Sequence, residues 1–218
     1  MPLGTGLGST GPWLDWVLAR AGFGSIGESA AGSRVPLRAT TGDSEISNVA
    51  SGARFPHTPR PMIRKLVARA GLIQELEAST KEAALQELLG VAQDVGAFPK
   101  TARKTLQKRL SDREAIGSTG LGNSVAVPHV KGEGVEEITL VVARCHPGIE
   151  WQAIDGRQVH VLFMLVSPMD DPESHLKCLR WIAGLARNTD FRRFLLDAEG
   201  EEAIRDLLVE MGGDGDEA

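Results

Sequence analysis

The stretch Val159–Val166, VHVLFMLV, decides the fold class because it is apolar at every position except His160. A short apolar run of this kind is typical of a strand that is covered on both faces. A second apolar stretch, Ile138–Arg144, precedes it, and Asp155-Gly156 lies between the two. We therefore predict two strong strands, with the second at the centre of the sheet and Asp155-Gly156 in a hairpin-like turn.

Helical patterns flank these strands in the sequence. Ser79–Glu82 has the form of a capping box and opens a run with apolar residues at every third or fourth position, which should end at Gly96. Further helices are expected over Thr101–Leu110 and from Met62, Asp171-Pro172, Asp190 and Glu199. Strands alternating with helices predict an α/β (α+β) domain in which helices cover a mixed β-sheet.

Composition sets the expected limits of the domain. Residues 1–61 are rich in Gly, Ser, Ala, Arg and Pro and lack periodic apolar positions, so we expect a disordered or linker-like extension. The extension is interpreted as a flexible segment, as a partner-recruiting tail using Trp13, Trp16 and Leu18, or as a translation start placed too far upstream of Met62. The compositional bias slightly favours the last. The ordered domain should span residues 62–211, followed by an acidic frayed tail at 212–218.

The composition argues against several classes of function. The formal charge of −5 gives no basic field for nucleic acid. No stretch approaches the ~20 apolar residues of a membrane helix, and the start lacks the basic region of a signal peptide, so we expect a cytoplasmic protein. Cys145 and Cys178 are expected to be buried, reduced thiols. Together with His146 and His175 they lack any recognised metal-ligand spacing, so no metal site is predicted.

The segment Gly117–Lys131, GSTGLGNSVAVPHVK, carries the chemical signal. Its three glycines allow positive φ and bring backbone N–H groups close to an anion, and the hydroxyls of Ser118 and Thr119 add donors. Pro128 stiffens the backbone before His129, which is a nucleophile that is largely neutral near pH 7. A phosphoryl-binding loop beside a reactive imidazole suits a phosphohistidine intermediate. The alternatives are an ordinary turn and a structural Pro-His pair.

Other motifs extend this pattern. Arg113-Glu114 precedes the glycine-rich segment, Asp155-Gly156 precedes the apolar strand, and Ser174-His175-Leu176 opens a helix. Together they resemble the mannitol/fructose-type enzyme IIA domain of the phosphoenolpyruvate-dependent sugar phosphotransferase system, a family that includes nitrogen-related regulatory members. The resemblance covers about residues 62–211. Two positions depart from it: Lys131 stands where Arg is often found, and Ser124 where glycine is common.

The resemblance implies roles for individual residues. His129 would be phosphorylated, and His175, either protonated or as a hydrogen-bonding group, would grip the phosphoryl group or orient His129 from a helix start, where the dipole favours an anion. Arg113 would supply a bidentate guanidinium. The phosphoryl oxygens are expected to bind Ser118, Thr119 and Gly120. Without the resemblance, Arg113 would be interpreted as solvated and His175 as a structural helix residue.

The implied function is phosphohistidine phosphotransfer. The protein would accept phosphate from an HPr-like phosphocarrier on His129 and pass it to a IIB partner for sugar uptake. The alternative is a regulatory, nitrogen-type IIA protein whose phosphorylation state controls binding to a target protein. A metal-binding stress protein is a third and weaker hypothesis. We expect no cofactor other than the transient phosphoryl group. His160 should be a core histidine, His146 a turn residue and His57 a solvated bystander.

Overall fold

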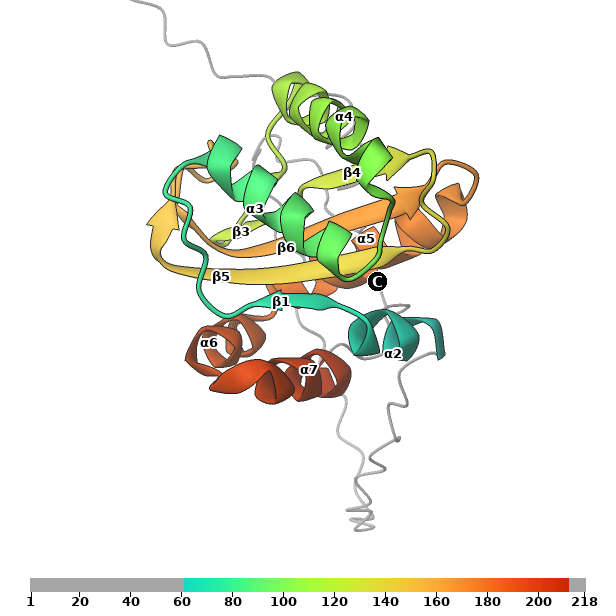
Figure 1. Cartoon of the computed structure of the whole chain (residues 1–218). Coiled ribbons are helices and arrows are strands. Elements are labelled where there is room, and N and C mark those ends of the chain that lie inside the picture. The colour runs from blue at the N-terminus through green and yellow to red at the C-terminus, as the bar shows by residue number, and fades with distance from the viewer. Residues whose placement is uncertain (1–60, 212–218) are drawn as a thin grey trace, which may run out of the picture.

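The computed structural model describes residues 61–211, in which a six-stranded β-sheet lies between two layers of helices (Figure 1). The expected extension up to residue 60, with His57, and the expected tail at 212–218 lie outside the described residues. In chain order the elements are α2 (Pro61–Ala68), β1 (Gly71–Ile73), α3 (Lys81–Asp94), a 3-10 turn (Lys100–Ala102), α4 (Arg103–Ile116), β2 (Gly120–Gly122), β3 (Val125–Ala126), β4 (His129–Gly132), β5 (Thr139–Ile149), β6 (Val159–Pro168), α5 (Pro172–Arg187), α6 (Thr189–Asp197) and α7 (Gly200–Met211).

Strand β6 is the centre of the sheet, as its apolar composition predicts. It pairs antiparallel with β5 along one edge, from Thr139↔Val166 to Ile149↔Val159. Along its other edge it pairs in parallel with β3 and then with β4, so two short strands of one segment share the same neighbour. The remaining strands extend the sheet in the order β1-β5-β6-β3-β2. The mixed sheet covered by helices is therefore confirmed.

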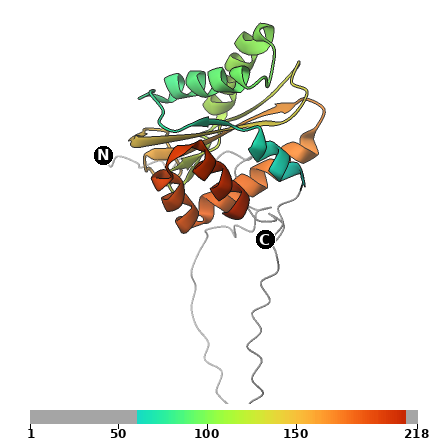
Figure 2. The same cartoon turned by 60° about the horizontal axis from the view of Figure 1, so that its bottom comes forward.

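Alternate residues of β6 enter two separate hydrophobic cores. Leu162, Met164 and Val166 pack on one face with residues of α3 and α4. Val161, Phe163 and Leu165 pack on the other face with residues of α2, α5, α6 and α7. Figure 2 shows these two helical layers on opposite sides of the sheet. Because successive strand side chains point to opposite faces, helices on both faces require apolar residues at every position.

Several helix boundaries differ from the sequence predictions. The N-cap of α3 is Thr80, whose Oγ1 accepts from the amide of Ala83 at 3.3 Å, so Ser79 is not the cap of a capping box. Helix α4 runs to Ile116, six residues past the expected end, because residues 111–116 do not continue the apolar stripe of Leu106 and Leu110. Asn188, rather than Asp190, caps α6 by accepting from the amide of Phe191.

Other local predictions can be checked directly. Asp171 caps α5 as expected, since its carboxylate accepts from the amide of Ser174 at 3.0 Å. Gly96 ends α3 with a φ of 83°. His146 was expected in a turn but lies within β5, where its ring contacts the Glu75 carboxylate and the carbonyl of Leu196. That prediction was wrong because β5 continues through an irregularity in its pairing to Ile149.

Candidate phosphoryl-transfer site

His129 is held in place by the central strand. It is the first residue of β4 and lies opposite Leu165 of β6, whose amide donates to the carbonyl of Pro128 at 3.0 Å. Pro128 separates β3 from β4, and both strands pair with β6. The His129 side chain is only 7% exposed. Its backbone is therefore anchored on both sides of the proline to the central strand, which is buried along almost its whole length.

Hydrogen bonding decides the tautomer of His129. Its Nδ1 lies 2.8 Å from the carbonyl oxygen of Val127. A carbonyl oxygen only accepts, so Nδ1 carries the proton, and Nε2 carries the lone pair in the neutral ring. Burial lowers the pKa of His129 from 6.5 to about 4; Arg113 and Lys131 also lower it, while the Val127 bond and Glu114 oppose the change. The ring is therefore a neutral base and nucleophile at pH 7.

His175 lies beside His129, as the resemblance implies. The two ring centroids are 5.5 Å apart and the rings are tilted by 58°. His175 is in the first turns of α5 and its Nδ1 lies 2.7 Å from the hydroxyl of Ser167. Burial lowers its pKa to about 3, and the nearby His129 and Lys131 add to this effect. Of the two roles expected for His175, the neutral hydrogen-bonding role fits this environment and the protonated one does not.

Two cations lie near the histidine pair. Arg113 is in the last turn of α4 and donates from Nη1 to the carbonyl of Gly117 at 2.8 Å. Burial lowers the pKa of Arg113, and the neighbouring Glu114 partly offsets this. Arg113 is thus partly buried and not simply solvated. Lys131, on β4, influences the pKa of both His129 and His175, so it is a second site cation that the sequence prediction did not include.

The glycine-rich loop is held together by its own contacts. The Ser118 hydroxyl donates to the carbonyl of Trp151 at 2.8 Å and accepts from the amide of Gly120. The amide and hydroxyl of Thr119 both donate to the carboxylate of Glu114. The loop donors expected to bind phosphoryl oxygens thus have partners within the protein. Their role in phosphoryl binding stays a prediction, and it requires these partners to be exchanged.

The glycines of this loop serve the backbone in different ways. Only Gly122 has the expected positive φ, at 83°, whereas Gly117 is extended with a φ of 175°. A Cβ on Gly120 would lie 2.8 Å from Cα of Ala153, so glycine here permits close approach of the loop after Trp151. Of the three glycines at which the sequence allows positive φ, the backbone uses it at Gly122 and not at Gly117 or Gly120.

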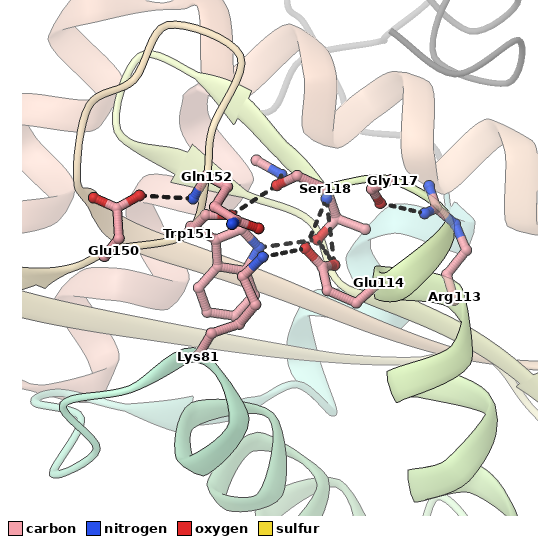
Figure 3. A network of polar contacts seen from close by, with 10 residues as sticks. Lys81, Arg113, Glu114, Gly117, Ser118, Glu150, Trp151 and Gln152 are labelled. Carbon is pink, nitrogen blue, oxygen red and sulfur yellow. Dashed lines mark hydrogen bonds and ion pairs between the residues drawn. The ribbon is translucent and has the colours of Figure 1, made fainter. Parts of the chain in front are cut away.

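Glu114 is the centre of a buried polar network that the sequence analysis did not assign. Its carboxylate accepts from Lys81 of α3 at 3.0 Å and from the Thr119 hydroxyl at 2.6 Å. The Lys81 ammonium lies 5.5 Å from the ring centroid of Trp151, whose Nε1 donates to the hydroxyl of Thr119. Figure 3 shows Lys81 and Glu114 pointing toward each other beside the indole. The only sequence signal was the position of Glu114 next to Arg113.

Among the described residues, the remaining histidine and cysteine candidates form no hydrogen bond or ion pair with the residues of this site. His160 is partly buried, and its Nδ1 is 3.0 Å from the carbonyl of Cys145. Cys145 and Cys178 are buried free thiols. Within residues 61–211 no group of three His, Cys, Asp or Glu side chains could hold a metal ion. No helix in the same range is long and apolar enough to span a bilayer.

Comparison with known proteins identifies the family. Residues 67–211 match the family described as phosphoenolpyruvate-dependent sugar phosphotransferase system, EIIA 2. The chain belongs to this family. Among EIIA-type relatives, it is 33% identical over 133 residues to the fructose-specific EIIA component of Haloferax volcanii, a match that covers 61% of this chain and 85% of that protein. It is also 33% identical over 147 residues to a nitrogen regulatory protein of Bradyrhizobium diazoefficiens, covering 67% and 94%.

A solved structure supports the same assignment for the EIIA fold. The nitrogen regulatory protein IIA-Ntr of Neisseria meningitidis is 26% identical and aligns with a TM-score of 0.61, covering 67% of this chain and 98% of that one. The resemblance inferred from the sequence is therefore confirmed. The matched relatives include a sugar-specific component and nitrogen regulatory proteins, which correspond to the two functions inferred from the sequence.

Proposed function

We propose that this EIIA protein carries a phosphoryl group on Nε2 of His129, which it receives from an HPr-like phosphocarrier and passes in trans to a IIB partner. The observation that carries this proposal is the hydrogen bond from Nδ1 of His129 to the carbonyl of Val127. It leaves the lone pair of a neutral imidazole on Nε2. Phosphohistidine chemistry needs this nucleophile, properly placed, and little other covalent machinery.

The transfer step balances without proton transfer. The Nε2 lone pair attacks the phosphorus of the phosphohistidine on the carrier, and the new N–P bond forms as the P–N bond of the carrier breaks. The electron pair of that bond returns to the imidazole of the carrier. His129 keeps its Nδ1 proton, so its phosphorylated ring is cationic, and the carbonyl of Val127 stabilises that charge. No cofactor is needed beyond the phosphoryl group itself.

Positive charge near His129 supports the anionic group. Arg113 and Lys131 both act on the ring electrostatically, and their positive charge would favour a dianionic phosphoryl group on it. His175 stands at the N-terminal end of α5, where the helix dipole also favours an anion. The hydroxyls and amides of Ser118, Thr119 and Gly120 would bind the phosphoryl oxygens after leaving their present partners.

The second candidate function is regulatory. The match to the Bradyrhizobium nitrogen regulatory protein covers 94% of that protein, so the relationship is not confined to sugar-specific components. In this case the phosphorylation state of His129 would control binding to a target protein. Both functions use the same chemistry and, we propose, operate in the cytoplasm, where phosphoenolpyruvate is available.

Phosphorylation in vitro tests the proposal. Incubation with phosphoenolpyruvate, enzyme I and an HPr-type carrier should place an acid-labile label on the wild type and none on His129→Ala. The matched control is His146→Ala, because His146 is exposed and lies toward the far end of β5 from the site. Phosphorus NMR should identify Nε2 as the modified nitrogen. Wild-type labelling of His129→Ala, or a phosphoryl group on Nδ1, would contradict the proposal.

Addition of a IIB protein then separates the two functions. Rapid loss of label to a fructose- or mannitol-type IIB partner would favour uptake. Stable label together with phosphorylation-dependent binding to another protein would favour regulation.

A further inference from the structure

Ser167 connects the central strand to the second histidine of the site. It lies near the end of β6, is fully buried, and faces Lys131 in the pairing of β6 with β4. Its Oγ is 2.7 Å from Nδ1 of His175. His129 pairs with Leu165, two residues earlier on the same strand. One strand therefore positions both histidines, His129 through the backbone ladder and His175 through the Ser167 side chain.

The direction of this hydrogen bond follows from the acceptors available to the proton of the Ser167 hydroxyl. The bond to His175 is the one hydrogen bond of the Ser167 hydroxyl within residues 61–211. If Nδ1 of His175 donated, the hydroxyl proton of a fully buried serine would have no acceptor, which is costly. If the hydroxyl donates, both groups are satisfied. Nδ1 of His175 is then the acceptor, and in the neutral ring the proton resides on Nε2.

The two histidines thus hold complementary tautomers. His129 has its proton on Nδ1, bonded to the carbonyl of Val127, and offers a lone pair on Nε2. His175 has its lone pair occupied by Ser167 and offers an Nε2–H group. With ring centroids 5.5 Å apart, the ring that holds the nucleophilic nitrogen lies beside the ring that holds the hydrogen-bond donor. A donor beside the nucleophile suits the phosphoryl oxygens that arrive there.

We propose that Ser167 is a positioning residue that holds His175 in the Nε2–H tautomer, so that His175 donates a hydrogen bond to the phosphoryl group on His129. The inference rests on the proposed phosphorylation of His129 for its consequence, but the tautomer itself does not depend on phosphotransfer. Ser167 does not contact the reacting atoms and acts only through His175.

Nitrogen-15 NMR of the imidazole rings tests the tautomer at pH 7 without any phosphotransfer partner. We expect His175 as Nε2–H and His129 as Nδ1–H in the wild type. In Ser167→Ala the His175 signals should move toward a mixture of tautomers, while those of His129 stay unchanged. Ser167→Thr, which keeps the hydroxyl, should retain the wild-type pattern. His175 found as Nδ1–H in the wild type, or unaffected by Ser167→Ala, would overturn the inference.

Phosphotransfer rates give the second measurement. Loss of a group that orients a metal-ligating imidazole costs about 10- to 100-fold. We take the lower end for an imidazole that binds a phosphoryl group, so Ser167→Ala should slow labelling of His129 by about 10-fold. Because Ser167 acts through His175, the double variant Ser167→Ala/His175→Ala should be no slower than His175→Ala alone. Independent, additive losses would overturn the inference. Absence of label from the wild type would refute the proposed function, while the NMR result would still decide the tautomer.

Discussion

Replacing Glu114 with glutamine should destabilise the protein by about 3 kcal/mol, because it breaks a buried ion pair and leaves its shape intact. The Glu114 side chain is 7% exposed and that of Lys81 12%. One carboxylate oxygen accepts from Lys81 at 3.0 Å and the other from the Thr119 hydroxyl at 2.6 Å, while the Thr119 amide contacts both. Glutamine has a single acceptor oxygen, so either the Lys81 ammonium or the Thr119 hydroxyl must face its NH₂ group.

The magnitude follows from which partner is left unpaired. Removing one member of a buried ion pair costs about 3–5 kcal/mol, because the other charge stays desolvated. We expect the lower end because Lys81 retains its contact with the Trp151 ring and some exposure. The amide oxygen can also still accept from the Thr119 hydroxyl. For a domain of this size, about 3 kcal/mol corresponds to a fall in melting temperature of roughly 6–12 °C.

Urea unfolding followed by circular dichroism measures the effect. Lys81→Met and the double variant complete a cycle, in which the double variant should lose at least about 1 kcal/mol less than the sum of the single variants. Asp112→Asn is the control, because the Lys108–Asp112 pair is exposed at 77% and 58% and should contribute less than about 0.5 kcal/mol. A Glu114→Gln variant within about 0.5 kcal/mol of the wild type would refute this reasoning.

Three further predictions concern the site and the core. The folded-state pKa values of His129 and His175, about 4 and about 3, lie below 6.5. Below about pH 6.5 the unfolded chain therefore binds more protons than the folded one, and the free energy of unfolding should fall as the pH drops toward 4. The urea midpoint should fall less between about pH 7 and about pH 5 in His129→Gln than in the wild type. His175→Ala and Arg113→Ala should each slow phosphorylation or onward transfer, by ~10–1000-fold, with folding retained; wild-type transfer rates in both would show that the site is misassigned. Arg144 is 6% exposed and donates to the carbonyls of Gln74, Leu195, Leu196 and Ala198. Arg144→Met should therefore lower the free energy of unfolding by about 2–3 kcal/mol and speed amide exchange in α6, without slowing the labelling of His129. Unchanged exchange in α6 would contradict this prediction.

Much of the fold could be predicted because its signals are local. The continuous apolar sequence of β6 indicates that helices cover both of its faces. The Asp171-Pro172 pair indicates the start of α5. The end of α4 could not be predicted, because residues 111–116 do not continue the apolar stripe of the helix. The Arg113 side chain donates to the carbonyl of Gly117 at this end. His146 was placed in a turn because Pro147-Gly148 follows it, but the pairing of β5 with β6 carries the strand past both.

The sequence by itself determined the class of the domain, the identity of the phosphoryl-site histidine as a prediction, and the family, since these depend on residue types at short spacing. Only the tertiary structure decided that burial holds the pKa values of His129 and His175 well below 6.5, which tautomers they hold, and that Lys81, Glu114 and Ser167 support the site. These properties arise from burial and from contacts between α3, α4, α5 and the sheet. Such contacts join residues far apart in the chain, and no periodicity or spacing within a single segment records them.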